Sequence, residues 1–260
     1  METTSELKQL LKALRLSSLL TTLPERVAYA KGNKLTHLEF LEMLLSDEVE
    51  RRDQGALTRR LLNAKVNHDE VLERFDWGAS ITLDRDRFKG LMSLEWVECK
   101  ENVIMTGPVG VGKSFLANAL AHSACRRNKS VFLVKAAKMF KVLYAARADN
   151  SLERELLKLI SPVLLVIDDF GLEQLTPEQS HDFYEIISER YGRGSTILTS
   201  NREVGEWINL FNDQILANSA LDRLAHNAHQ LVIEGESYRK KKGTRQRPEV
   251  KEKPELRINR

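Results

Sequence analysis

The spacing of apolar residues indicates that the first part of the 260-residue chain is helical. A first helix is predicted by leucines at the i, i+3, i+4, i+7 spacing of one buried face. These are Leu7, Leu10, Leu11 and Leu14. Thr36 and Glu39 have the spacing of a capping box, so a longer helix should begin there and run to about Lys65. Its apolar side would carry Leu38, Leu41, Leu44, Leu45 and Val49.

The rest of the chain alternates short apolar runs with helical segments, which favours a parallel sheet with crossover helices. The predicted strands are residues 103–106, 131–134, 163–167, 196–199 and 231–233. One crossover helix is clearly delimited, with Thr176 as its cap, Pro177 in its first turn and Gly192 after its end. A turn-rich aromatic stretch at residues 75–81 interrupts the helical pattern. We therefore predict a helical domain over residues 1–75 and an α/β domain over residues 76–238.

Composition is that of an ordinary soluble protein, with 42% hydrophobic and 30% charged residues. No apolar run reaches the ~18 residues of a membrane span, and the polar start has no signal-peptide core. Cys99 and Cys125 are isolated, so neither a metal site nor a redox motif is expected from cysteine. These features predict a cytoplasmic protein that does not enter membranes.

Positive charge is concentrated at the end of the chain. Residues 239–260 hold ten Lys and Arg against three Glu, although the net charge of the whole chain is only +3. Such a tail either attracts a polyanion or remains a solvated, solubilising segment. A second basic surface is the polar face of the long N-terminal helix, where phosphate contacts and simple solvation both remain open. Its residues are Arg51, Arg52, Arg59 and Arg60.

The segment GPVGVGKS at residues 107–114 matches G-x-x-x-x-G-K-[ST] in full and lies between a predicted strand and a predicted helix. Its glycines let backbone amides approach phosphates, and the helix that follows adds its N-terminal amides. Lys113 would reach the β- and γ-phosphates of ATP, and the Ser114 hydroxyl would bind Mg²⁺. The predicted nucleotide-binding residues are Gly107, Pro108, Val109, Gly110, Val111, Gly112, Lys113, Ser114 and Phe115.

Two carboxylates follow the apolar run at residues 163–167, and a P-loop site needs a carboxylate at the end of a neighbouring strand. Because adjacent strand residues point to opposite faces, only one of the two can reach the metal directly. We assign Asp168 to Mg²⁺ and Asp169 to polarising the attacking water. Both are predicted to lie just beyond the strand end.

Three further polar residues are candidates for the hydrolytic site. Asn201 follows a predicted strand and would hold the water near the γ-phosphate, although it could instead cap the next turn. Arg223 would act on the ATP of a neighbouring subunit, because an arginine supplied from outside neutralises transition-state charge. Arg239 would contact the γ-phosphate within its own subunit. Either arginine could instead form a surface ion pair.

The motifs GPVGVGKS, VLLVIDDFG, TSN, DRL and GESYRK, in this order, resemble those of AAA+ ATPases of the DnaC clade, and most closely the IstB-type proteins of bacterial insertion sequences. The resemblance covers the whole chain. It implies an AAA+ three-layer core with a five-stranded parallel sheet. It further implies an ATPase that assembles on double-stranded DNA with ATP as a homo-oligomer, remodels the DNA and stimulates a partner transposase.

Two departures from the general AAA+ pattern affect these expectations. Asp169 stands where a glutamate is usual, so basal hydrolysis should be slow. The helical lid is absent or vestigial, since only the basic tail follows the last predicted strand, and a neighbouring subunit should help to enclose ATP. Within the core, a row of basic residues could contact DNA phosphates or be a solvated face. It comprises Lys135, Lys138, Lys141 and Arg147.

Two other functions are compatible with parts of the sequence. A helicase loader would carry the same motifs but prefer single-stranded DNA. A small-molecule kinase would need an acceptor pocket and a lid, and neither is indicated.

Overall fold

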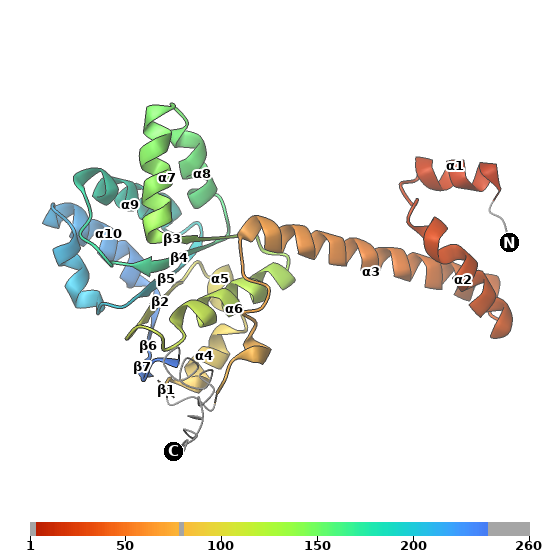
Figure 1. Cartoon of the computed structure of the whole chain (residues 1–260), viewed down its shortest axis with the longest axis horizontal. Coiled ribbons are helices and arrows are strands. Elements are labelled where there is room, and N and C mark those ends of the chain that lie inside the picture. Colours follow the sequence, from red (N-terminus) through yellow and green to blue (C-terminus); the bar gives the residue numbers. More distant parts are fainter. Residues whose placement is uncertain (1–3, 78–80, 239–260) are drawn as a thin grey trace, which may run out of the picture. The chain divides into compact units, whose positions relative to one another are not determined.

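The computed structural model of the chain describes residues 4–77 and 81–238 (Figure 1). The chain forms two compact units, Met1–Arg60 and Leu61–Arg260. The boundary expected at residue 75 therefore falls inside the second unit, because residues 61–75 pack on the α/β core. Among the described residues, no helix has the length and apolar character needed to cross a membrane.

The first unit consists of helices, as the sequence predicts. They are α1 (Ser5–Ala13), α2 (Leu19–Gly32) and most of α3 (His37–Ala64). The capping box at the start of α3 is present: the Thr36 amide donates to the Glu39 carboxylate at 2.7 Å, and the Glu39 amide donates to the Thr36 hydroxyl at 3.3 Å.

The expected burial of the first helix is wrong. Leu10 and Leu14 are 56% and 66% exposed, and α1 has no buried residue. In α3 the inward side carries Leu44 and Glu48, whereas the other predicted apolar positions remain exposed. A polar network decides this orientation, because Glu48 accepts hydrogen bonds from Ser18 at 2.5 Å and from two arginines of its own helix.

The second unit contains a five-stranded parallel sheet, and all five predicted strands are confirmed. They are β2 (Asn102–Thr106), β3 (Val131–Lys135), β4 (Leu164–Phe170), β5 (Ser195–Ser200) and β6 (Ala228–Val232). Their order is β3-β4-β5-β2-β6. The strand that carries the two aspartates is thus not the immediate neighbour of β2 that the sequence pattern suggests, because β5 lies between them.

Helices cover both faces of this sheet and complete the three layers of the expected α/β fold (Figure 1). On one face, Ile104, Leu165 and Leu198 join a buried cluster with four helices. These are α7 (Ala136–Ala148), α8 (Leu152–Ile160), α9 (Pro177–Arg190) and α10 (Gln214–His226). The other face is covered mainly by α6 (Lys113–Arg126), with α4 (Arg85–Leu91) and α5 (Glu95–Glu98) beside it.

Short elements complete the second unit. They are the 3₁₀ turns η1 (Leu72–Arg74) and η2 (Val204–Leu210), and the strands β1 (Ile81–Thr82) and β7 (Glu234–Gly235), which pair antiparallel. Helix α9 begins with the expected Thr176 cap, which forms a capping box with Gln179. Only residues 233–238, which include β7, follow β6 within the described part of the chain. The predicted basic tail, 239–260, lies outside the described residues.

A buried arginine connects α9 to the ends of three neighbouring elements. Arg190 is 2% exposed and donates hydrogen bonds to the carbonyls of Leu159, Ile160 and Pro162 at 2.8–3.0 Å. Its Nε also donates to the Thr196 hydroxyl at 3.1 Å. Burial lowers the pKa of this guanidinium to about 10. The arginine thereby fixes the end of α8 against the starts of β4 and β5.

Candidate functional site

The loop between β2 and α6 is held in a conformation that requires glycine. Gly107 and Gly110 have φ values of +141° and +86°. A Cβ at Gly107 would overlap the Ile233 carbonyl oxygen, and one at Gly110 would overlap the Ser237 hydroxyl. The Tyr238 amide also donates to the Gly110 carbonyl at 3.0 Å. The segment after β6 therefore packs directly on the loop and leaves room only for glycines.

Lys113 begins α6 and points back into the loop. Its side chain is almost fully buried, and its Nζ donates to the carbonyls of Gly107 and Pro108 at 2.7 Å. The same Nζ donates to Asn201 Oδ1 at 2.6 Å. Asn201 follows β5, so the parallel strands bring it to the same sheet edge as the loop. Its amide is engaged with Lys113, and the following 3₁₀ turn η2 has no side-chain cap.

The two aspartates lie within β4 rather than beyond it. Pairing between β4 and β5 is irregular between Ile167 and Phe170, and Asp169 has a left-handed φ of +58°. Such an irregularity changes the direction of side chains locally. Asp168 is buried, whereas Asp169 is half-buried and lines the cavity described below.

Thr199 of β5 holds both aspartates, a role that the sequence did not indicate. Its hydroxyl donates to Asp168 Oδ1 at 2.6 Å and accepts from the Asp169 amide at 3.0 Å. The one sequence signal was a polar residue at the end of an apolar strand. One hydroxyl thus fixes the direction of the first carboxylate and the backbone of the second.

Lys135 lies at this site and not on a helical face. It is the last residue of β3, and its Nζ forms an ion pair with Asp169 Oδ2 at 2.8 Å. The expected regular row of lysines along one helix therefore begins only with Lys138. Asp169, the carboxylate assigned to polarising the attacking water, therefore has Lys135 as a cationic neighbour. From the sequence, this lysine was considered as a contact to DNA.

A cavity of about 510 Å³ joins these groups. It is lined by Lys135, Asp169 and Asn201 and by residues 109–115 of the loop and the start of α6. A segment that no sequence motif connects with the site lines it as well. Its residues are Glu70, Arg74, Phe75 and Asp76, and Tyr238 also lines the cavity. Most residues of the phosphate-binding motif are thus gathered around one cavity.

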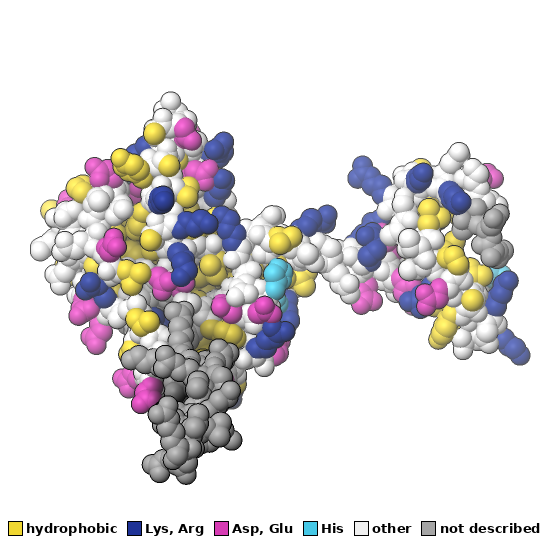
Figure 2. Space-filling view, in the orientation of Figure 1, with side chains coloured by type: hydrophobic (Ala, Val, Ile, Leu, Met, Phe, Trp, Pro, Cys, Tyr) yellow, Lys and Arg dark blue, Asp and Glu magenta, His cyan; other side chains and the backbone are white. Residues whose placement is uncertain are grey.

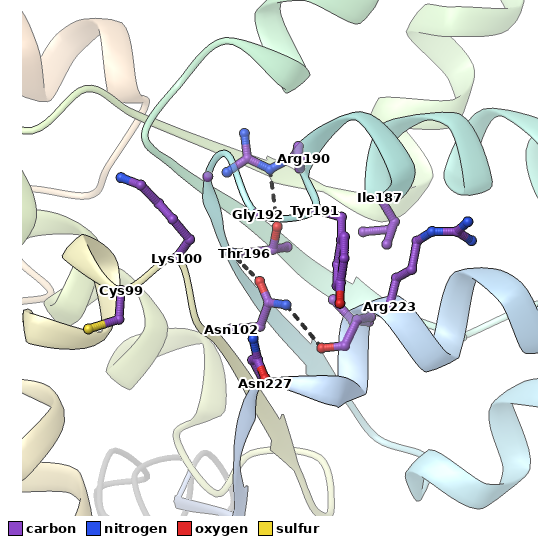
Figure 3. Close-up of a pocket in the computed structure, with 12 residues that line it drawn as sticks. Cys99, Lys100, Asn102, Ile187, Arg190, Tyr191, Gly192, Thr196, Arg223 and Asn227 are labelled. Atoms are coloured by element: carbon purple, nitrogen blue, oxygen red, sulfur yellow. Dashed lines mark hydrogen bonds between the residues drawn. The ribbon is translucent and has the colours of Figure 1, made fainter.

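Arg223 lies at the opposite edge of the sheet. It is near the end of α10 and lines a smaller pocket with Asn102, Thr196 and Asn227, which stand at the amino ends of β2, β5 and β6 (Figure 3). Its guanidinium points away from Asn102, donates to the Ser219 carbonyl at 2.8 Å and stacks over Tyr184. Arg223 and the loop of its own chain therefore lie at opposite ends of the strands. Arg239 lies outside the described residues.

The basic residues considered for DNA differ in their contacts. Arg147 is bound to Asp182, with one hydrogen bond of 3.0 Å, and Asp182 is almost fully buried, so this arginine stabilises the core. Arg51 and Arg52 both bind Glu48, and they hold the pKa of that carboxylate well below its usual range together with Ser18. Arg59 is exposed and Arg60 half-buried.

Lys138 and Lys141 lie on the exposed side of α7. Basic side chains are visible over the region of α7 and α8 in Figure 2, mixed with apolar and acidic ones. Of the basic residues of the second unit that were considered as contacts to DNA, these two lysines therefore remain candidates.

Comparison with known proteins identifies the family. The model of the family described as IstB-like ATP-binding protein matches residues 9–246. The chain belongs to this family. The family expected from the order of the sequence motifs is thereby confirmed, and with it the expected class of enzyme, an ATPase.

Relatives of the IstB-like family align over nearly the whole chain. An insertion-sequence ATP-binding protein of Mycobacterium tuberculosis is 40% identical over 91% of this chain and 94% of its own length. The ATP-binding protein of insertion sequence IS21 from Pseudomonas aeruginosa is 36% identical over 91% of this chain and 89% of its own.

Solved structures support the AAA+ fold of this IstB-like chain. A crystal structure of DnaI has a TM-score of 0.55 and 21% identity, covering 63% of this chain and 90% of that one. The replication initiator DnaA has a TM-score of 0.54 and 19% identity, covering 66% of this chain and 51% of its own. At these identities the likeness concerns the fold alone.

Proposed function

We propose that this chain is an ATP-dependent helper of transposition, which assembles on double-stranded DNA, remodels it and recruits a partner transposase. The observation that carries the proposal is the agreement over 91% of the chain with ATP-binding proteins of insertion sequences. The cavity at the carboxyl ends of the strands supports the ATP-dependent part. Its loop, lysine and carboxylates have the chemistry that phosphoryl transfer requires.

Mg²⁺ is the cation that fits this donor set. The Ser114 hydroxyl and the Asp168 carboxylate are hard oxygen donors, and Mg²⁺ is commonly held by one or two such groups together with substrate phosphates and water. Among the described residues no group of three or more His, Cys, Asp or Glu forms a protein-only metal cage. When bound, the ion would neutralise charge on the phosphates. Thr199 would keep Asp168 directed for this role.

Hydrolysis is expected to depend on Asp169. In Asp169→Asn the side chain keeps its shape but loses the charge that would polarise the attacking water, so kcat should fall by about 10²-fold, while the Kd for ATP changes little. Phosphate release at saturating ATP and DNA measures the first quantity, and ATP titration the second. Asp86→Asn, at a highly exposed carboxylate of α4, is the matched control. Unchanged turnover in Asp169→Asn would remove this residue from the catalytic step.

Contact with DNA is proposed for Lys138 and Lys141, repeated along a duplex by successive subunits. Such contacts bind phosphates without reading sequence, so affinity should fall steeply with salt. Replacing either lysine by alanine should weaken duplex binding and make the logarithm of the binding constant less dependent on salt, with a slope smaller by about one. Lys89→Ala in α4 is the control, since that lysine is exposed but lies on another helix.

The same binding assay tests the proposed function. ATP should promote binding to duplex DNA more than to single strands of equal length, and the complex should sediment as an oligomer. Added to the transposase of its own insertion sequence, the chain should stimulate strand transfer only with ATP. A preference for single strands with no stimulation would contradict the proposal and favour a helicase loader.

A further inference from the structure

Residues 66–76 form a strap that runs from the end of α3 along α6 to the cavity. The last turn of α3 and the first residue of the strap are anchored in the second unit, because Leu61, Ala64 and Val66 are buried there. Near the end of the strap, the ring of Phe75 lies 5.4 Å from that of Phe115, in the first turn of α6. A Cβ at Gly112 would press against the ring of Phe75. The strap is thus packed against the start of the phosphate-binding helix.

One buried side chain of α6 holds this strap. Asn118 is 3% exposed, and its Oδ1 accepts a hydrogen bond from the backbone amide of Asn67 at 2.9 Å. Its Nδ2 donates to the Asn67 carbonyl at 2.9 Å and to the Glu70 carbonyl at 3.0 Å. All three bonds are made to backbone, so they fix the path of the strap irrespective of its side chains. Arg126 and Glu73 add an exposed ion pair between α6 and the strap, and such pairs contribute little.

The strap contributes to the lining of the cavity. Glu70, which Asn118 holds directly, lines the cavity together with Arg74, Phe75 and Asp76. Lys135, Asp169 and Asn201 line the same cavity. If Asp169 and Asn201 act on a triphosphate held by the loop, its γ-phosphate lies beside them. The lining outside the loop and these residues consists of the strap and Tyr238, so the base and ribose would extend toward the strap, where Phe75 offers an aromatic surface.

We propose that Asn118 is a positioning residue for the nucleoside half of ATP. It does not touch the nucleotide; it holds the strap in the place where base and ribose are bound. Asn118 can have this role only if ATP binds in the cavity, as the proposed function requires. The role is independent of DNA and of the transposase.

The test compares ATP with inorganic tripolyphosphate, which offers the phosphates without base or ribose. In Asn118→Asp the acceptor for the Asn67 amide remains but both donated hydrogen bonds are lost, and a charge faces two carbonyls. The Kd for Mg·ATP should rise about tenfold, whereas the Kd for Mg·tripolyphosphate should change less than about twofold. In hydrolysis, KM should rise with kcat nearly unchanged. Asn63→Asp, at an exposed asparagine in the last turns of α3, is the matched control.

Other outcomes would overturn the inference in distinguishable ways. Equal weakening of ATP and tripolyphosphate would mean that Asn118 only stabilises α6, and no weakening would mean that the strap does not need it. Failure of the unsubstituted chain to bind Mg·ATP would instead overturn the proposed function.

If Asn118→Asp does not fold, hydrogen exchange of the unsubstituted chain tests the proposed role of the strap instead. ATP should protect the amides of residues 66–76 more than tripolyphosphate does. Equal protection by both, or protection by neither, would overturn the inference.

Discussion

Replacement of Lys113 by alanine is expected to abolish ATP hydrolysis, with turnover reduced by a factor on the order of 10²–10³. The ammonium group is almost fully buried and is held within the loop by two carbonyls and by Asn201. A charge in such a water-poor place interacts strongly with phosphates, because the local dielectric is low. Its removal takes away the cation that would neutralise charge as it develops on the transferred group.

Phosphate release at saturating Mg·ATP measures this effect. Lys113→Arg is an informative companion, because it keeps the charge but replaces a compact ammonium by a planar fork that does not fit the same place. We expect it to be nearly as inactive as the alanine variant. Lys89→Ala, at an exposed lysine of α4, should hydrolyse ATP normally. Retention of more than about a tenth of the turnover in Lys113→Ala would exclude a direct role in phosphoryl transfer.

The main elements of the fold could be predicted because their signals are local. Each strand is a short apolar run bounded by polar residues, and the capping box of α3 is predicted from two residues three positions apart. The cap of α9 is likewise predicted from Thr176 and the proline that follows it. Strand order is not local. The insertion of β5 between β2 and β4 depends on how the crossovers pack, and no single segment encodes it.

The candidate site could be predicted only in its contiguous motifs. Residues 107–115 and the two aspartates carry their chemistry in adjacent positions, and all of them except Asp168 contribute to the lining of one cavity or to its loop. The contacts of Thr199 with Asp169 and of Phe75 with Phe115 form only through folding, because the two partners of each contact are 30 or more residues apart in the chain. Contacts of this kind leave no periodic pattern in the sequence.

The burial of the N-terminal leucines was predicted wrongly for a related reason. Helical periodicity shows that a helix has an apolar side, but it does not show what covers that side. In the first unit the inward direction of α3 is set by the Glu48 network, which combines Ser18 of one segment with arginines of another. A buried carboxylate with three hydrogen-bonding partners lies on the inward side of α3, and the apolar stripe beside it stays exposed.

Arg223→Ala is expected to reduce ATP hydrolysis in the assembled state by a factor on the order of 10³, the usual effect of an arginine supplied to a neighbouring site. Arg223 lies at the amino ends of the strands, whereas the loop, Asp169 and Asn201 lie at the carboxyl ends. The guanidinium therefore cannot serve its own ATP without crossing the sheet. A head-to-tail neighbour could bring the two edges together.

Mixing of two inactive variants tests this arrangement directly. Subunits with Lys113→Ala have an intact Arg223, and subunits with Arg223→Ala have an intact loop. In an equal mixture about a quarter of the head-to-tail interfaces combine both intact groups, so activity should return to roughly that fraction. Mixing Lys113→Ala with the double variant should restore no ATP hydrolysis.

Arg193→Ala, at an exposed arginine near the same edge of the sheet, is the control and should remain active. If Arg223→Ala alone hydrolyses ATP normally on DNA, or if the mixture stays inactive, Arg223 does not act between subunits.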